Sequence, residues 1–536
     1  MKPVIPQKLL FVLLILALGM FACNLPLATP GSLASPTPSL PPFTPAPELA
    51  VSPGVTQLPE PRPPLPAAPL PTISYQPTFR PAPCEFSVPE GYDPKCGYLV
   101  VPEDRTRTDS PPIRLHVAVF RSRSDQPAPD PVVHLAGGPG SSSLEVAGYL
   151  FQQGLDAVLE HRDLILFDQR GAGYSQPRLD CPEREELTPK LLDGSLSQEQ
   201  GDQAVQQAFA QCRERLTTAG RDLAAYTSAA SAADVDDLRR TLGYPQINLY
   251  GVSYGSRLAL TLLRDHPEAV RSAVLDSAYP LQVNLYTSLA PNAGRAFDIF
   301  FDHCAADPSC STNYSGLEQA FYHLVDRLNA EPITITLTSA QSEYPIQLDG
   351  DLLIDVLFVG LYNPRVTASM PEMIYAVQRG DFDLLEQRLW LYFAGTTALG
   401  MQMSVQCAEE IPFNSPQEAY TQAEGVQPQI AAFFPASVQS LFAVCRKWAL
   451  VPPDPRENQP VHSDIPTLVL AGEIDPITPP EWGRLVAEDL SDAAFFEFPE
   501  VGHWVTRASP CAVEMALAFW EEPNSPVDSI CLEQTD

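Results

Sequence analysis

A serine lies between two glycines in the run G-V-S-Y-G at residues 251–255. Apolar residues 247–250 precede this run as a predicted strand, and a helical pattern begins near Ser256. A tight strand-to-helix turn favours flanking glycines, because neighbouring backbones approach closely there. Such a turn projects the Ser253 hydroxyl beyond the end of the strand. A serine presented in this way predicts nucleophilic attack on an acyl carbon.

The hydroxyl of a serine is a weak nucleophile at neutral pH, so Ser253 needs a base. His503 follows a predicted strand near the end of the chain, and Asp475 follows the predicted strand before it. We expect Asp475 to orient the ring of His503, and His503 to take the proton of Ser253. Glu473 is the alternative acid, although its side chain is expected to point away from the tip of its loop.

Acyl transfer also needs hydrogen-bond donors for the negative oxygen that develops on the substrate. The backbone N–H of Tyr254 is one candidate, because it follows the nucleophile directly. The run G-G-P-G at residues 137–140 follows an apolar strand, and the N–H of Gly138 is the second candidate. A simple Gly-Pro turn without a catalytic role is the alternative interpretation of this run.

Short apolar strands alternate with helical segments from residue 84 onward. The predicted strands are 97–102, 113–120, 131–136, 164–167, 247–250, 273–275, 467–470 and 493–498. This alternation predicts an α/β fold, with a mostly parallel central sheet covered by helices on both faces. Residues 281–460 break the rhythm and predict an inserted, mainly helical cap with a short hairpin strand at 333–337. The core is then expected in two parts, residues 84–280 and 461–536.

The N-terminus has the pattern of an export signal. Residues 1–22 contain two lysines followed by an apolar run that is short for a membrane span and typical of a signal peptide. The run ends before Cys23 in a pattern that resembles a bacterial lipoprotein signal, which makes Cys23 the candidate lipid attachment site. Ordinary cleavage and an uncleaved anchor are the alternatives. Residues 23–83 are rich in proline and predict a disordered tether. We therefore expect an extracytoplasmic protein, either an envelope lipoprotein or secreted.

Cysteine spacing and charge exclude several other classes of protein. The chain has eleven cysteines and no C-x-x-C pair, so we expect no metal site and no cofactor. Apart from Cys23, ten cysteines remain, and export favours disulfides. Many pairings are possible; we favour sequence neighbours, which are 84–96, 181–212, 304–310, 407–445 and 511–531. The net charge of −32 argues against nucleic acid as a partner.

Together these motifs resemble the α/β-hydrolase peptidases of the prolyl aminopeptidase and secreted tripeptidyl aminopeptidase (TAP-like) family. The run at 137–140 is similar to the family's H-G-G-P-G loop, with Ala136 where the family has His. Residues 168–175 are similar to its D-Q-R-G-x-G-x-S segment, and residues 466–480 and the last cysteine pair to its C-terminal region. The resemblance covers residues 95–535, least well in the cap, and implies the α/β-hydrolase fold.

The resemblance implies an aminopeptidase that releases one or a few residues from a peptide with a free N-terminus. The run C-A-E-E at 407–410 resembles the family's C-A-E-D segment, which implies that Glu409, or else Glu410, binds the substrate ammonium; solvated cap residues are the alternative. Asp168 and Arg170 are expected to brace the oxyanion loop through a local ion pair. An esterase or other small-acyl hydrolase is the alternative function. The membrane is expected as a partner only through a lipid anchor.

Overall fold

The computed structural model describes residues 75–339, 342–393, 397–448 and 452–533. The expected signal peptide, Cys23 and most of the expected tether lie outside the described residues. The prediction that the tether is disordered as far as residue 83 is wrong at its end. Thr78–Pro81 form strand β1, which pairs antiparallel with β2, Lys95–Pro102. A proline is accommodated here because β1 is the edge strand of the sheet, where a missing N–H breaks no ladder.

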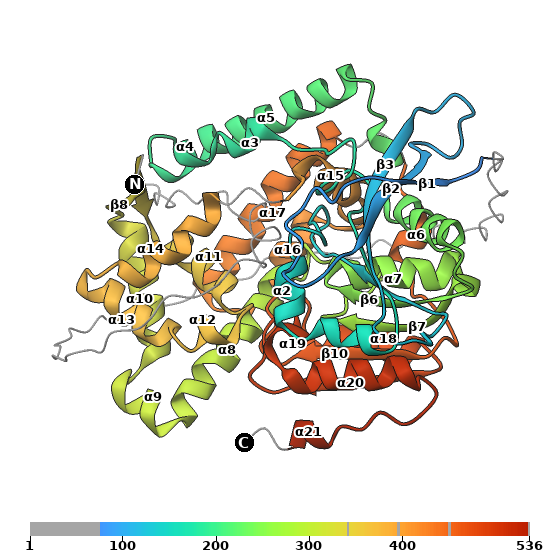
Figure 1. The fold of residues 1–536 in the computed structure, drawn as a ribbon. Helices are drawn as coiled ribbons and strands as arrows, with labels where there is room; N and C mark the ends of the chain where they lie inside the picture. Colours follow the sequence, from blue (N-terminus) through green and yellow to red (C-terminus); the bar gives the residue numbers. More distant parts are fainter. Residues whose placement is uncertain (1–74, 340–341, 394–396, 449–451, 534–536) are drawn as a thin grey trace, which may run out of the picture.

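A central sheet forms the core (Figure 1). Its nine strands follow the spatial order β1-β2-β3-β5-β4-β6-β7-β10-β11. In this order, neighbouring strands from β1 to β5 pair antiparallel. The strands β5, β4, β6, β7, β10 and β11 pair in parallel. The eight predicted strands are all present, which confirms the mostly parallel sheet. The remaining strands are β3 Pro112–Phe120, β4 Val132–Leu135, β5 Leu164–Phe167, β6 Ile247–Val252, β7 Val270–Asp276, β10 Thr467–Gly472 and β11 Ala493–Phe498.

Helices cover both faces of the sheet, because alternate residues of each strand point to opposite faces. Leu249 of β6 belongs to the apolar cluster on one face, and its neighbour Tyr250 to the cluster on the other. On the first face lie α6 Ser228–Leu242, α7 Tyr254–Asp265 and α18 Pro480–Asp489. On the second lie α2 Ala147–Gln152, η1 Leu155–Glu160 and α20 Pro510–Glu521. Short elements that complete the core are η2 Leu223–Ala225, η3 Pro267–Ala269, α19 Val505–Ala508 and α21 Ile530–Glu533.

The register of the parallel strands brings their carboxyl ends to one edge. Leu135 at the end of β4 pairs with Gly251 of β6, and Val252 pairs with Asp276 at the end of β7. The chain passes from β4 to β5 on one side and later enters β6 on the other. A crevice opens at such a switch in strand order, and the loops that leave β4 and β6 border it.

Mainly helical elements lie between β7 and β10 in the chain, and we refer to them as the cap (Figure 1). The expected hairpin is present as β8 Ile333–Thr338 and β9 Glu343–Leu348. The other cap elements are α8 Leu289–Ala306, α9 Pro308–Asn313, α10 Leu317–Ala330, α11 Gly350–Gly360, α12 Pro364–Thr367, α13 Met370–Arg379, α14 Asp383–Leu389, η4 Trp390–Phe393, α15 Leu399–Val405, η5 Gln406–Glu410, η6 Ile411–Phe413, α16 Pro416–Gln422, α17 Pro428–Trp448 and η7 Pro455–Asn458.

A second excursion, α3 Pro182–Glu185, α4 Thr188–Leu192 and α5 Gln198–Thr218, packs with the cap rather than with the core to which the sequence assigned it. The buried residues Val205, Phe209 and Leu216 form a stripe on α5, and this helix packs against α17. Many polar residues of α5 conceal this stripe in the sequence, so only its partner helix reveals which part of the molecule α5 joins.

Helix α17 is the one helix among the described residues that is long and apolar enough to span a membrane, and 56% of its apolar window is buried inside the fold.

All five predicted disulfides are confirmed: Cys84–Cys96, Cys181–Cys212, Cys304–Cys310, Cys407–Cys445 and Cys511–Cys531. Disulfides persist in oxidising compartments, so these bridges indicate that the folded part is extracytoplasmic. The bridge at Cys407 ties the segment Gln406–Glu410 to α17 inside the cap.

Candidate active site

Ser253 occupies the sharp turn between β6 and α7. Its φ of 57° and ψ of −124° place a non-glycine residue in a strained region, as is common at functional sites. A Cβ at Gly255 would collide with the carbonyl oxygen of Leu135, and one at Gly251 would collide with Gly255. Both glycines are therefore required by the close approach of β4, β6 and α7, as the sequence predicts.

Asp475 and His503 lie together at the ends of β10 and β11. His503 Nδ1 is 2.8 Å from Asp475 Oδ2, and the carboxylate is fully buried. The backbone N–H groups of Ile477 and Thr478 each donate to Asp475 Oδ1 at 2.9 Å, and the Thr478 hydroxyl donates to Oδ2 at 2.7 Å. Burial alone would raise the pKa of Asp475, but the charge of His503 and these donors together hold it below its ordinary value. Asp475 is thus a fixed anion beside the ring.

Glu473, the alternative acid, points away from His503. Its Oε2 accepts from the N–H of Glu500 at 2.8 Å, and its Oε1 lies 3.5 Å from His303 of α8. Arg295 of α8 donates to the carbonyl oxygens of Glu473 and Asp475 at 2.9 and 3.0 Å. A cap helix therefore holds the loop that carries the acid.

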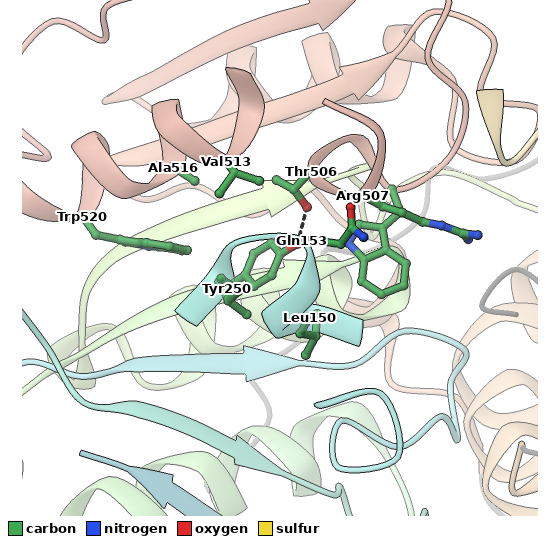
Figure 2. A pocket seen from close by; sticks show the side chains of 10 residues that line it. Leu150, Gln153, Tyr250, Thr506, Arg507, Val513, Ala516 and Trp520 are labelled. Atoms are coloured by element: carbon green, nitrogen blue, oxygen red, sulfur yellow. Dashed lines mark hydrogen bonds between the residues drawn. The ribbon is translucent and has the colours of Figure 1, made fainter. Parts of the chain in front are cut away.

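Residues of β6 and β7 fix the loop that carries His503. The carboxylate of Asp276 accepts from the N–H groups of Val505 and Thr506 at 2.7 and 2.9 Å. The Tyr250 hydroxyl contacts Thr506 in an apolar cavity of about 340 Å³ behind the loop, between α2 and α20 (Figure 2). Ser253 does not line this cavity, which is therefore separate from the candidate nucleophile.

Two cavities meet at Ser253. The acidic cavity, about 410 Å³, is lined by Gly138, Pro139, Ser253, Tyr254, Arg257, Tyr279, Leu285, Val405, Gln406, Glu409, Glu410, Ile477 and Thr478. The neutral cavity, about 500 Å³, is lined by His134, Ala136, Gly137, Gly138, Ser141, Val252, Ser253, Tyr362, His503 and Trp504. No hydrogen bond joins Ser253 to His503 in the described part of the chain, but both border the neutral cavity. Catalytic contacts of this kind often tighten only when substrate binds.

The two candidate oxyanion donors also lie beside Ser253. Gly138 and Tyr254 line the acidic cavity together with Ser253. Tyr254 is the first residue of α7, where backbone N–H groups have no acceptor within the helix and the helix dipole favours negative charge. Gly138 has a φ of 108°, which glycine adopts without strain. The arrangement can therefore present two N–H groups next to one hydroxyl.

The predicted ion pair between Asp168 and Arg170 is wrong. Arg170 pairs instead with Asp234 of α6 at 2.7 Å, because that carboxylate is fully buried and needs a cation. Asp168 does brace the oxyanion loop, through neutral donors: the Ser142 hydroxyl at 2.7 Å and the Leu144 N–H at 3.2 Å. Burial raises the pKa of Asp168 to about 7.

Glu409 and Glu410 are both buried and both line the acidic cavity, so they are not solvated cap residues. Glu409 accepts from the N–H and the hydroxyl of Ser228 at 2.6 and 2.5 Å. Glu410 accepts from the N–H of Leu285 at 2.8 Å and from the Asn414 amide at 3.0 Å. The π-helical turn Gln406–Glu410 places both residues on the wall of the cavity that Ser253 also lines, and such turns are frequent at functional sites.

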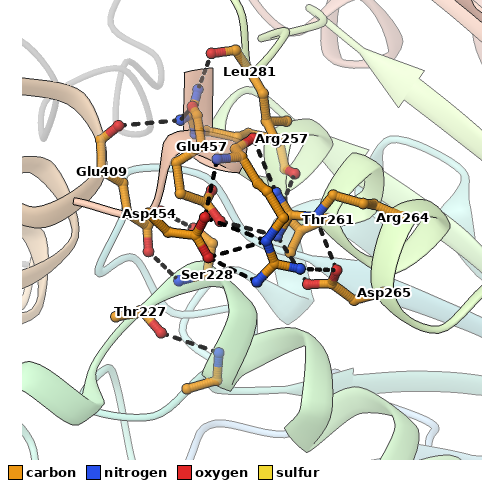
Figure 3. Close-up of polar contacts among 12 residues, drawn as sticks. Thr227, Ser228, Arg257, Thr261, Arg264, Asp265, Leu281, Glu409, Asp454 and Glu457 are labelled. Atoms are coloured by element: carbon orange, nitrogen blue, oxygen red, sulfur yellow. Dashed lines mark hydrogen bonds and ion pairs between the residues drawn. The ribbon is translucent and has the colours of Figure 1, made fainter. Parts of the chain in front are cut away.

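The acidic cavity has more buried carboxylates than buried cations. Arg257 lies 3.5 Å from Glu410. It also donates to the carbonyl oxygen of Glu457 at 2.7 Å (Figure 3). The carboxylate of Glu457 pairs with Arg264 at 2.9 Å. Burial, and then the neighbouring Glu457, raise the pKa of Glu409, while Arg257 lowers it. The site would therefore be stabilised by one additional positive charge.

Three residues of this region were missed from the sequence. Gln406 lines the acidic cavity, and its buried side-chain oxygen has no partner within the described ranges. Its spacing of three residues from Glu409 on one helical turn could have revealed it. Thr478 is 3.1 Å from His503 Nδ1, three residues after the acid. Tyr362 packs its ring on His503 at a centroid distance of 4.8 Å, and no local pattern indicates this contact.

The sequence was compared with protein-family models and with known proteins. Residues 130–323 match the family model of the α/β hydrolase fold, and residues 431–531 match that of TAP-like proteins. The serine protease Hip1 of Mycobacterium tuberculosis is 23% identical over 465 residues, which cover 82% of this chain and 87% of Hip1. A tripeptidyl aminopeptidase of Streptomyces lividans is 30% identical over 193 residues, 34% of this chain and 35% of that protein. Carboxylesterase B of M. tuberculosis is 28% identical over 207 residues, 37% of this chain and 39% of that protein. The chain therefore has the α/β hydrolase fold and a TAP-like C-terminal region, and its relatives include serine hydrolases.

Proposed function

We propose that this serine hydrolase is an exported aminopeptidase, which releases one or a few residues from peptides with a free N-terminus. The observation that carries the proposal is that Ser253 lines the same cavity as the buried carboxylates Glu409 and Glu410. An ammonium bound there would make charge-assisted hydrogen bonds. A blocked N-terminus would occupy the same space and leave the carboxylates without a cation, which disfavours it.

The proposed mechanism assigns one task to each group at the junction of the cavities. Ser253 Oγ attacks the scissile carbonyl carbon while His503 takes its proton, and Asp475 stabilises the imidazolium that forms. The N–H groups of Gly138 and Tyr254 bind the oxyanion. His503 then gives the proton to the departing amine, and an acyl-enzyme on Ser253 remains. Water activated by the same histidine hydrolyses this intermediate and restores the serine.

A small-acyl esterase is the second candidate function. The same serine, histidine and aspartate can process an ester, and Carboxylesterase B is among the relatives. The two candidates differ in what they require of the substrate: the peptidase uses the carboxylates of the acidic cavity, and the esterase does not.

Paired substrates separate these two functions. We expect the kcat/KM of a tripeptidyl 4-nitroanilide with a free N-terminus to exceed that of its N-acetylated form by about 100-fold or more, since the blocked form leaves buried charge unpaired. Ser253→Ala should abolish both activities while the circular dichroism spectrum stays unchanged. Equal turnover of the free and blocked forms contradicts the aminopeptidase proposal, and turnover of 4-nitrophenyl esters alone favours the esterase.

The N-terminal segment belongs to the same proposal. We infer that Cys23 is lipidated and that the proline-rich segment holds the enzyme away from the membrane surface. The five disulfides support export, and the sequence before Cys23 supports the lipid. Cells fed with labelled palmitate should incorporate label into the wild-type protein and not into Cys23→Ser; equal labelling of both would exclude this site.

A further inference from the structure

The two cavities at Ser253 differ in chemical character. They share only Gly138 and Ser253 among their lining residues. The acidic cavity contains two carboxylates and an arginine, whereas none of the described residues that line the neutral cavity is an aspartate, glutamate, lysine or arginine. A peptide bound across the nucleophile would therefore have its two halves in different environments.

The position of His503 decides which half of a peptide enters which cavity. His503 lines the neutral cavity and not the acidic one. The departing amine must receive its proton from the histidine, so the leaving nitrogen has to lie on the side of His503. The ammonium at the other end of the acyl part is placed with Glu409 and Glu410. This ordering rests on the proposed aminopeptidase function.

We propose that the neutral cavity is a leaving-group subsite, which binds the first residue of the departing peptide and selects an uncharged one. Once the peptide has left, the same space admits the water that hydrolyses the acyl-enzyme, because that water is activated by the same histidine.

Tyr362 is the residue that would recognise the departing peptide. Its hydroxyl is buried and has no hydrogen-bond partner among the described residues, and buried polar groups in folded proteins nearly always have one. Burial raises the pKa of Tyr362 well above its ordinary value, so the hydroxyl keeps its proton and can donate. The backbone carbonyl of the first departing residue is an acceptor of the right kind.

His134 adds a second unsatisfied group to the same cavity. Its Nδ1 is 2.9 Å from the Ser143 hydroxyl, and its Nε2 has no partner in the described part of the chain. Burial lowers the pKa of His134 to about 3, so the ring is neutral and the cavity gains no charge from it. A charged side chain placed in this cavity would lose its hydration without gaining a counter-ion.

Tyr362→Phe tests the subsite, because it removes one oxygen and keeps the ring that packs on His503. Two substrates with the same acyl part are compared: a peptide with alanine after the scissile bond, and the 4-nitroanilide, which has no peptide carbonyl there. We expect kcat/KM to fall about tenfold for the peptide and to stay within twofold for the anilide, since one hydrogen bond is lost.

Tyr322→Phe is the matched control. Tyr322 of α10 also has a buried hydroxyl with no partner among the residues that the structure describes, but it lines neither cavity, so both activities should be unchanged. An equal loss on both substrates in Tyr362→Phe would indicate that Tyr362 only positions His503 and would overturn the proposal. No loss on either substrate would overturn it as well. Failure of the wild-type enzyme to distinguish free from blocked N-termini would instead contradict the proposed function itself.

The wild-type enzyme provides a second test that needs no variant. Peptides that differ only in the first departing residue should be cleaved at least tenfold faster with alanine than with aspartate or lysine, because the charged side chains are desolvated without a partner. Equal rates for the three peptides would show that the departing residue is not enclosed by this cavity.

Discussion

Glu409→Gln tests the amine site with the smallest change of shape. Both oxygens of Glu409 are held by Ser228. The glutamine oxygen can still accept from the Ser228 N–H, and its amide can face the Ser228 hydroxyl, which has a second partner in the Tyr254 hydroxyl at 2.8 Å. The variant is therefore expected to keep the cavity. It removes a carboxyl whose pKa burial raises to about 8, and which a bound ammonium would hold in its ionised form.

The magnitude follows from what the charge contributes. A hydrogen bond to a charged group contributes about 1.5–3 kcal/mol, which corresponds to a loss of about 10- to 150-fold in kcat/KM for a substrate with a free N-terminus. We expect the upper part of this range, because Arg257 then faces Glu410 as the remaining carboxylate of the cavity and neutralises it more completely. The N-acetylated substrate carries no ammonium, so its kcat/KM should stay the same or rise.

The assay compares the free and acetylated tripeptidyl 4-nitroanilides and a 4-nitrophenyl ester, each with the wild-type and variant enzymes. Glu473→Gln is the control, because it neutralises a carboxylate close to the site that lines neither cavity. That control should leave all three activities within twofold. An equal loss on the free and acetylated substrates in Glu409→Gln would refute the reasoning, because the effect would then be independent of the ammonium.

Two further substitutions probe the acid and the cap. Asp475→Asn should lower kcat about 10³- to 10⁴-fold on amide and ester substrates alike, with little change in KM, because an amide favours the wrong tautomer of His503; a loss below tenfold would contradict its role. Burial raises the pKa of Asp355 to about 8, with the Tyr392 hydroxyl donating to it at 2.6 Å. The folded state therefore keeps a proton that the unfolded state loses near pH 4, and wild-type stability falls as pH rises toward 8, by up to about 1.4 kcal/mol per pH unit. Asp355→Asn should gain stability relative to the wild type across this window, measured by urea unfolding at pH 5 and pH 8; a constant difference between the two pH values would disprove this.

Much of the candidate site could be predicted because its signals are local. The glycines around Ser253 and the apolar strands before Asp475 and His503 are short patterns, and parallel strands must bring their carboxyl ends to one edge. The disulfide pairs were predictable for a similar reason, since each joins cysteines that are neighbours along the chain. The choice of Asp475 over Glu473 as the acid that faces His503 could be made from their positions on the loop alone.

Contacts between distant segments were not predictable. The partner of Arg170 is Asp234, 64 positions away, whereas the sequence suggested the aspartate two positions before it. Helix α5 joins the cap through a stripe of apolar residues that its many polar residues conceal. A proline-rich stretch looked disordered throughout, yet its last residues form the edge strand β1.

The chain's own pattern was enough to identify a serine, a histidine and an aspartate at the ends of strands, because backbone geometry depends on near neighbours. Only the folded arrangement showed that Ser253 lines both an acidic cavity and a neutral one. That difference arises where the cap meets the core: Glu409 and Tyr362 come from separate cap segments, and burial by residues far along the chain sets their charge and hydrogen bonding. Burial and electrostatic environment are properties of the packed molecule, and no short stretch of sequence contains them.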